Sequence, residues 1–186
     1  MKEHDFIKTV MLRQSIHDRQ WWQVTAHAFE EADPKVKNRG EDPTIPITSY
    51  QLSIASPAGT TIIIHMDKKS KNGLAEYIAK LKLICVNLTD YVWHLEQNGF
   101  REVYVKKSFL NPNHPSFNSS MAMGILPEHK EADLVISDCN RSVRLYSHSD
   151  DPELKNFSNT IETLVGFIKV FLAWLESEQK RLSKPV

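Results

Sequence analysis

Side chains that could bind a nucleic-acid strand alternate along the segment from Arg141 to His148. Arg144, Tyr146 and His148 occupy every second position, and apolar Leu145 lies between the first two. Alternate residues of a β-strand point to the same face, so this pattern predicts a strand with one face of cations and rings. Such a face suits single-stranded nucleic acid, because cations hold phosphates and each stacked base contributes roughly 1–3 kcal/mol.

The segment from Phe100 to Phe109 alternates in the same way. Tyr104 and Lys106 fall on one face, with Val103 and Val105 on the other. We therefore predict that Tyr104 and Lys106 add a ring and a cation to a nucleic-acid-binding face. The alternative interpretation is an ordinary solvated antiparallel face, on which tyrosines and cations are common cross-strand partners.

Two adjacent tryptophans, Trp21 and Trp22, are candidate anchors for a protein partner. Tryptophan is enriched at the energetic centres of protein interfaces. Neighbouring residues of a strand point to opposite faces, so we expect one of the two rings to be exposed and the other to join the core.

The segment from Leu164 to Leu175 is apolar almost all round, and a helix of that kind must be covered on more than one side. Two interpretations remain open. The segment packs against a second long helix of the same chain, or it forms part of a homodimer interface. The residues predicted for that interface are Phe167, Val170, Phe171 and Trp174.

Catalytic and metal-binding motifs are not evident in the sequence. Glycine is scarce, at six residues, and the eight histidines are scattered. His17 with Asp18, His65 with Asp67, and Cys139 near a predicted turn are the weak candidates for catalysis. We predict no catalytic residue, no metal and no cofactor.

Composition indicates one ordinary globular domain over residues 1–186. Lys plus Arg and Asp plus Glu both total 23, which excludes a wholly basic packer of DNA. The two cysteines, Cys85 and Cys139, match neither a disulfide framework nor a zinc site. The charged N-terminal residues and the short apolar runs predict a cytoplasmic protein with no signal peptide and no membrane span.

The N-terminal half is expected to hold mainly strands. Residues 5–16 are predicted as a helix, and residues 20–29 as a strand, with a continued helix as the competing interpretation. Residues 32–46 are polar and rich in proline, which predicts a long mobile loop. A hairpin is expected from Ser49–Ser56 and Thr60–Met66, because a Pro-Ala-Gly turn joins them.

The C-terminal half is expected to hold two long helices separated by four strands. Apolar residues recur every three or four positions between Lys71 and Gln97, which predicts the first helix. Asp151 followed by a proline predicts the start of the second helix, which runs to about Leu182. The strands expected between the helices are residues 100–109, 120–126, 133–137 and 141–148.

These elements define an α+β fold with antiparallel sheets and two long apolar helices, in the coarse order α-βββ-α-ββββ-α. From Gln20 to Leu182 the layout, strands followed by a helix and then the same again, resembles that of Whirly-type and similar single-stranded nucleic-acid-binding proteins. The mix of helices and antiparallel strands is also similar to that of type III secretion chaperones, which form dimers. Both resemblances concern layout, so they carry no site residues.

The expected function is that of a non-enzymatic, homo-oligomeric binding protein. We expect it to bind a protein partner, in the manner of a chaperone or an inhibitor, through a sheet face or a groove. Binding of single-stranded nucleic acid and an enzyme of unrecognised type remain the alternatives.

Overall fold

Four antiparallel strands followed by a long helix form the repeating unit of the chain, and the unit occurs twice. The computed structural model describes residues 6–13, 20–32, 46–67, 70–110, 119–147, 151 and 154–184. The first unit comprises β1 (Phe6–Arg13), β2 (Trp21–Ala32), β3 (Pro46–Ala55), β4 (Thr61–His65) and α2 (Gly73–Asn98). The second comprises β5 (Tyr104–Phe109), β6 (Ser119–Leu126), a 3-10 turn η1 (Pro127–His129), β7 (Glu131–Asp138), β8 (Arg141–Tyr146) and α3 (Lys155–Ser183).

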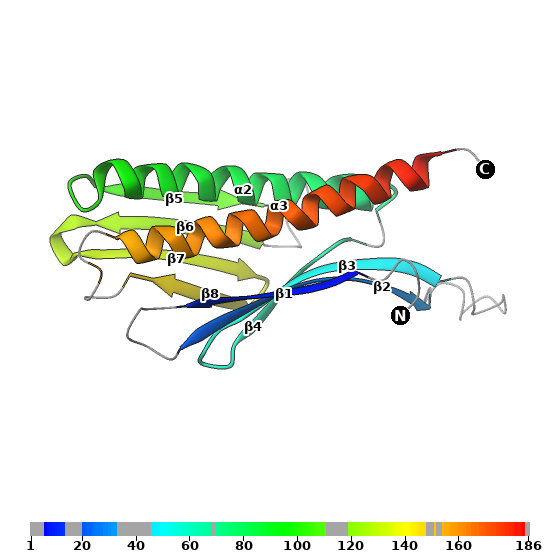
Figure 1. Cartoon of the computed structure of the whole chain (residues 1–186), viewed down its shortest axis with the longest axis horizontal. Coiled ribbons are helices and arrows are strands. Elements are labelled where there is room, and N and C mark those ends of the chain that lie inside the picture. Colours follow the sequence, from blue (N-terminus) through cyan, green and yellow to red (C-terminus); the bar gives the residue numbers. More distant parts are fainter. Residues whose placement is uncertain are drawn as a thin grey trace.

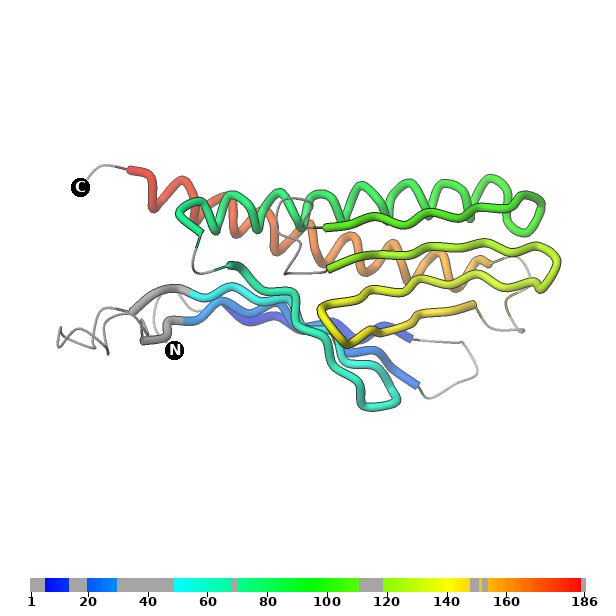
Figure 2. Tube along the Cα trace, turned by 180° about the vertical axis from the view of Figure 1, so that it is seen from behind, coloured from blue at the N-terminus to red at the C-terminus, as the bar shows by residue number. Residues whose placement is uncertain are grey.

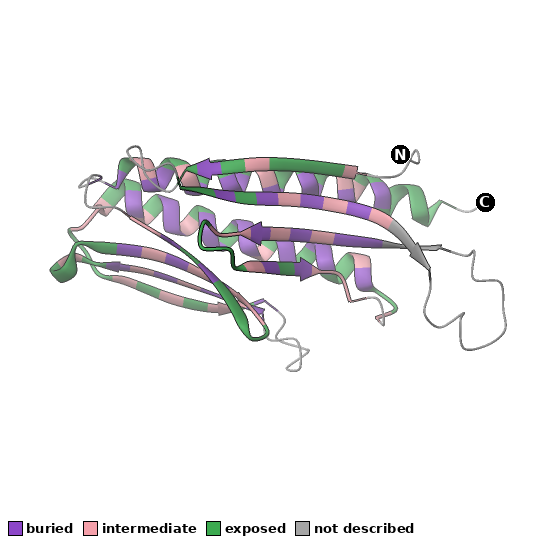
Figure 3. Cartoon of the chain, turned by 90° about the horizontal axis from the view of Figure 1, so that it is seen from below, coloured by how far each residue is buried: buried purple, intermediate pink, exposed green. Residues whose placement is uncertain are grey.

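Each unit contributes one four-stranded sheet. The strands lie in sequence order, β1-β2-β3-β4 in sheet 1 and β5-β6-β7-β8 in sheet 2, and all neighbours are antiparallel. The two sheets meet where β4 lies beside β8 and β7. Figures 1 and 2 show both helices side by side on the same side of the two sheets, running in opposite directions. The other side of both sheets carries no helix (Figure 3).

Two tyrosines connect α2 to both sheets. Near the start of the helix, Tyr77 Oη donates a hydrogen bond to the Ile64 carbonyl oxygen of β4 at 2.7 Å. Nearer the end, Tyr91 Oη donates to the carbonyl oxygens of Gly124 (2.7 Å) and Asp133 (3.0 Å), on β6 and β7. Burial raises the pKa of both tyrosines. The phenols therefore stay protonated as donors, and one helix holds sheet 1 and sheet 2 together.

The helix α3 completes the core from the opposite direction. It packs along α2, and its later turns reach β1. There Phe171 and Trp174 stack with Phe6, at ring-centroid distances of 5.6 and 4.7 Å. Buried residues of both sheets and both helices form a single hydrophobic cluster. Packing against α2, the first of the two interpretations for the apolar segment 164–175, is thus confirmed.

The length and apolar composition of α3 also suffice for a membrane span. In the 18-residue window of α3 that is apolar enough for such a span, 44% of the residues are buried inside the protein. The core helix of a globular protein can be equally long and apolar, so length and composition do not distinguish a core helix from a membrane-spanning helix.

The helix predicted for residues 5–16 is wrong. Residues 6–13 form β1, which pairs with β2 from Phe6 opposite Ala28 to Arg13 opposite Trp21. Apolar residues at Phe6, Val10 and neighbouring positions fit both periods, and the open edge of β2 decides for the strand because it supplies a complete hydrogen-bond ladder.

The other predicted elements are found close to their expected positions. The strand favoured for residues 20–29 is β2, which is longer than predicted. The α+β class, the antiparallel sheets and the two long helices are confirmed. The predicted start of the last helix at Asp151 is wrong, because α3 begins at Lys155 with Leu154 at its N-cap position. The Asp151 carboxylate nevertheless accepts from the backbone N–H groups of Asn156 and Phe157, at 3.1 and 2.8 Å. Residues 33–45 of the expected mobile loop lie outside the described residues.

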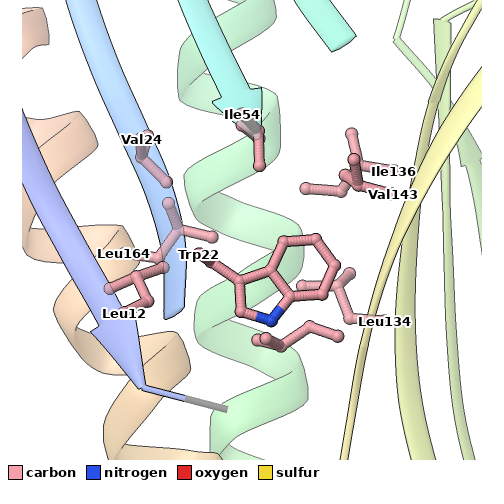
Figure 4. Close-up of a pocket in the computed structure, with 9 residues that line it drawn as sticks. Leu12, Trp22, Val24, Ile54, Leu134, Ile136, Val143 and Leu164 are labelled. Atoms are coloured by element: carbon pink, nitrogen blue, oxygen red, sulfur yellow. The ribbon is translucent and has the colours of Figure 1, made fainter. Parts of the chain in front are cut away.

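Trp22 fills the junction between the two sheets. Figure 4 shows its ring among apolar side chains from sheet 1, sheet 2 and α3. The space left there is a cavity of about 20 Å³, lined by Leu12, Trp22, Val24, Ile54, Leu134, Ile136, Val143, Leu145 and Leu164. That volume holds at most about one water molecule, and an apolar lining keeps such a cavity dry. The cavity therefore belongs to the core and is no ligand site.

Replacing Tyr91 by Phe tests the hydrogen bonds to sheet 2. The hydroxyl proton shared between the two carbonyl oxygens is lost, so we expect the free energy of unfolding at neutral pH to fall by about 1–3 kcal/mol. The unfolded chain releases the tyrosine proton near pH 10, whereas the folded chain retains it. The folded state then binds more protons, so its stability falls as the pH rises beyond about 10.

Tyr91→Phe should therefore reduce the alkaline loss of stability as well. Chemical denaturation of the wild type and the variant, at about pH 8 and about pH 10.5, measures both effects. A variant as stable as the wild type at the lower pH, with an unchanged alkaline loss, would contradict the assigned role.

Candidate binding surface on the outer faces of the sheets

The side of the sheets turned away from the helices, here called the outer face, is identified by the strand register. Directly paired residues of antiparallel strands share a face, and the buried apolar residues mark the inner one. On sheet 1, the described outer side chains are Ile7, Thr9, Met11, Arg13, Trp21, Gln23, Thr25, His27, Phe29, Ser49, Gln51, Ser53, Ala55, Thr61, Ile63 and His65. Arg13 is the one formal charge among these, with histidine taken as neutral, and no acidic residue occurs among them.

Several rings and one cation lie together on the outer face of sheet 1. The guanidinium carbon of Arg13 lies 5.1 Å from the centre of the Trp21 ring. The rings of His27 and Phe29 are 4.6 Å apart. Hydroxyl and amide side chains separate these pairs, and the aliphatic residues of this face are exposed to solvent. The surface thus offers stacking faces and neutral hydrogen-bonding groups with little competing negative charge.

The outer face of sheet 2 carries cation–ring pairs on its two edge strands. On β5, Lys107 Nζ lies 5.2 Å from the centre of the Phe109 ring. On β8, the Arg144 guanidinium carbon lies 5.1 Å from the centre of the Tyr146 ring. The remaining described outer residues are Val105, Ser120, Ala122, Gly124, Leu126, Glu131, Asp133, Val135, Ser137 and Ser142.

A groove of about 430 Å³ lies where the two sheets meet. Residues of β8 line it together with the β3–β4 turn and the first residues of β2. The lining residues are Gln20, Trp22, Ser56, Pro57, Ala58, Thr60, Ser142, Val143, Arg144 and Tyr146. Arg144 is the one formal charge in this lining, and its Nε donates to Asp133 Oδ2 at 3.0 Å.

The structure separates the residues predicted to bind nucleic acid. Arg144 and Tyr146 lie together on the outer face, and His148 lies outside the described residues. Tyr104 and Lys106 point the other way, toward α2. There Tyr104 Oη donates to Asp90 Oδ2 at 2.8 Å, and Lys106 Nζ lies 3.9 Å from the same oxygen.

The reason for this separation is that α2 covers the Tyr104 side of the edge strand β5. Burial, and next the hydrogen bond to Asp90, raise the pKa of Tyr104. Val103 and Val105, the residues on the opposite face, are instead 69% and 74% exposed. The sequence therefore predicted correctly that these residues alternate between two faces. It was wrong to place Tyr104 and Lys106 on the same face as Arg144 and Tyr146. Lys107 and Phe109 were missed, although they follow Val105 at the same alternate positions.

The two tryptophans divide as expected. Trp21 is 40% exposed on the outer face, whereas Trp22 is 4% exposed in the core. Trp21 is therefore accessible to a partner, and Trp22 contributes to the lining of the groove.

The four residues predicted for an oligomer interface lie on α3 in different environments. Phe171 is fully buried, and Phe167 and Trp174 pack against the core. Val170 is exposed. Three of these four residues are therefore in contact with the core of the same chain.

A buried chain of hydrogen bonds links α2 to sheet 2. Lys80 Nζ donates to Ser119 Oγ at 3.1 Å, and Ser119 Oγ donates to Asp138 Oδ1 at 3.0 Å. The pKa of Lys80 is lowered, because the effect of burial is larger than the opposite effects of Asp138 and Cys139. Ser119 is almost fully buried, so its hydroxyl is closed to a substrate from solvent. We interpret this series of hydrogen bonds as a structural link between α2 and sheet 2.

The remaining catalytic candidates are described only in part. Cys139 is exposed in the β7–β8 turn, and Cys85 is buried, which raises the pKa of its thiol to about 11. His17 and Asp18 lie outside the described residues. Among the residues that the structure describes, no group of three or more His, Cys, Asp or Glu could hold a metal ion.

Comparison with known proteins identifies no relative of this chain. No protein-family model matches the chain, and no curated protein or solved structure matches it.

The adjacent tryptophans provide a matched pair of substitutions. Trp22→Ala removes a ring from the junction of the two sheets, so we expect a loss of about 3–5 kcal/mol in the free energy of unfolding. Trp21→Ala removes an exposed ring and should change stability by no more than about 0.5 kcal/mol. Chemical denaturation of both variants measures the difference, and equal losses would contradict the assigned burial.

Proposed function

We propose that this chain is a non-enzymatic binding protein that holds single-stranded nucleic acid on the outer faces of its sheets. The observation that carries the proposal is the position of three cation–ring pairs. Arg13 with Trp21, Lys107 with Phe109, and Arg144 with Tyr146 all lie on the helix-free side. A ring that stacks on a base, with a cation next to it for the phosphate, is the unit from which single-strand sites are built.

The distribution of charge favours the same ligand. The chain as a whole is neutral, yet the described outer side chains of sheet 1 include a cation and no acid. Sheet 2 carries Asp133 and Glu131 on its outer face, and Asp133 is paired with Arg144. A phosphate backbone that crosses sheet 1 and the Arg144 region therefore meets little repulsion.

The architecture favours a single strand over a duplex. Reading duplex DNA usually requires a helix or a ribbon inserted into the major groove. Here both long helices lie on the opposite side, packed on each other and on the sheets. An open sheet with exposed rings suits unpaired bases, whose flat faces are accessible.

The element order supports the proposal at the level of layout. The order of four strands followed by a helix, twice, keeps the layout resemblance to Whirly-type single-stranded nucleic-acid-binding proteins drawn from the sequence, although no solved structure matches the chain. Because one fold serves many functions, this resemblance adds less weight than the residues do.

A protein partner is the second candidate, and a different observation favours it. Ile7, Met11, Trp21 and Ile63 are large apolar residues exposed on the outer face of sheet 1. Such a patch on a nearly uncharged face suits a protein surface, including that of a second copy of this chain.

Fluorescence anisotropy with labelled single-stranded and double-stranded oligonucleotides tests the first function. We expect preferential binding of the single strand, which weakens as salt is added because counterions are released. Arg13→Ala with Trp21→Ala, and separately Arg144→Ala with Tyr146→Ala, should each weaken binding at least about tenfold, since a stacked base contributes roughly 1–3 kcal/mol.

The matched control removes one cation and one ring from the helix side. Lys82 and Trp93 are both exposed on α2, so Lys82→Ala with Trp93→Ala should bind like the wild type. If no oligonucleotide binds at low salt, or if the control weakens binding as much as the outer-face variants do, the nucleic-acid function is wrong.

Ile7→Lys with Met11→Lys separates the two candidate functions. Two added cations on the outer face should preserve or strengthen nucleic-acid binding at low salt. The same charges should abolish association with a protein through the apolar patch. Light scattering after size exclusion measures self-association in parallel.

A further inference from the structure

The groove between the sheets differs from the rest of the outer surface in its depth and in its mixture of groups. Its volume of about 430 Å³ falls within the range of roughly 300–1,000 Å³ typical of small-molecule sites. A second hollow, of about 280 Å³, lies between α2 and α3. Glu162 and Lys169 line that one, so it carries both signs of charge and no ring, whereas the groove carries one cation and two rings.

The polar groups of the groove suit a phosphate. The two terminal nitrogens of Arg144 form no hydrogen bond with another described residue, because the ion pair with Asp133 uses Nε. The side chains of Gln20, Thr60 and Ser142 add an amide and two hydroxyls, and none of the three hydrogen-bonds to another described residue. The lining holds donors around one cation and no acid, which favours an anionic ligand, although Asp133 beside the lining already pairs with Arg144.

Arg144 is also held in place for stacking. Its Nε is fixed by Asp133, and the guanidinium lies 5.1 Å from the centre of the Tyr146 ring. A guanidinium plane stacks on flat rings. One side of it faces Tyr146, so a ring bound in the groove can stack on the other side.

We propose that the groove binds a single nucleotide unit, with its phosphate on Arg144 and the nearby hydroxyls and its base stacked on the guanidinium. This inference rests on the proposed function, because it assigns one subsite of the same surface. The unit has two sources: a free nucleoside monophosphate, or one nucleotide of a bound strand whose base leaves the stack.

Titration calorimetry of the full chain tests the inference. The probes are adenosine 5′-monophosphate, uridine 5′-monophosphate, adenosine, inorganic phosphate and a short single-stranded oligonucleotide. We expect saturable binding of the monophosphates and at least tenfold weaker binding of adenosine or phosphate alone, since each supplies half of the contacts.

Ser142→Trp fills the groove from an exposed position on β8. Ser177→Trp makes the same change at an exposed position of α3 and serves as the matched control. We expect Ser142→Trp and Arg144→Ala each to weaken monophosphate binding at least tenfold, and Ser177→Trp to bind like the wild type. Circular dichroism establishes that the variants are folded.

The outcomes separate this inference from the function on which it rests. Monophosphate binding without oligonucleotide binding supports the groove with free nucleotides as its source, and overturns the strand-binding function. If the wild type binds the oligonucleotide, and Ser142→Trp binds it equally well while no monophosphate binds, the groove inference is overturned and strand binding stands. If the wild type binds none of the probes, both are overturned.

Discussion

Two tyrosine hydroxyls on one helix determine how the two halves of this protein are joined. Tyr77 bonds to a carbonyl of sheet 1, and Tyr91 bonds to two carbonyls of sheet 2. At about 1.5 Å per residue, α2 is long enough to lie over both sheets, and α3 runs back along it. The two helices cover only the inner faces, so no helix lies on the outer faces of the strands. The binding surface results directly from this arrangement.

Most of the fold could be predicted from local patterns, because those patterns contain the answer. The apolar residues of α2 recur at three and four positions, and Tyr77 and Tyr91 share that buried stripe. The first strand could not be predicted in the same way. Phe6, Ile7, Val10 and Met11 fit a helix as well as a strand, and pairing with β2, the next strand along the chain, selects the strand.

The sequence predicts which surface residues are exposed where strand alternation settles the question, but not where contact with another element of the fold settles it. Strand alternation alone places one of Trp21 and Trp22 outside. It also separates Tyr104 from Val105, but it does not say which of them faces solvent. On β5, both faces carry a mixture of polar and apolar residues, so the position of α2 decides. Arg144 and Tyr146 lie beside buried Val143 and Leu145 on a strand whose apolar face is clear, and their outward direction followed from the sequence.

The small number of cations on the outer faces determines what kind of nucleic-acid binder this chain can be. A protein that neutralises many phosphates loses affinity steeply with salt. Here Arg13, Lys107 and Arg144 are the formal cations among the described outer side chains, and Arg144 already has an acidic partner. Most of the affinity must then come from stacking on Trp21, Phe109 and Tyr146 and from neutral hydrogen bonds. Stacking depends weakly on ionic strength, because no counterion is released when a base stacks on a ring. A shallow salt dependence, combined with a large effect of each ring, is therefore the form of binding that this distribution of side chains supports.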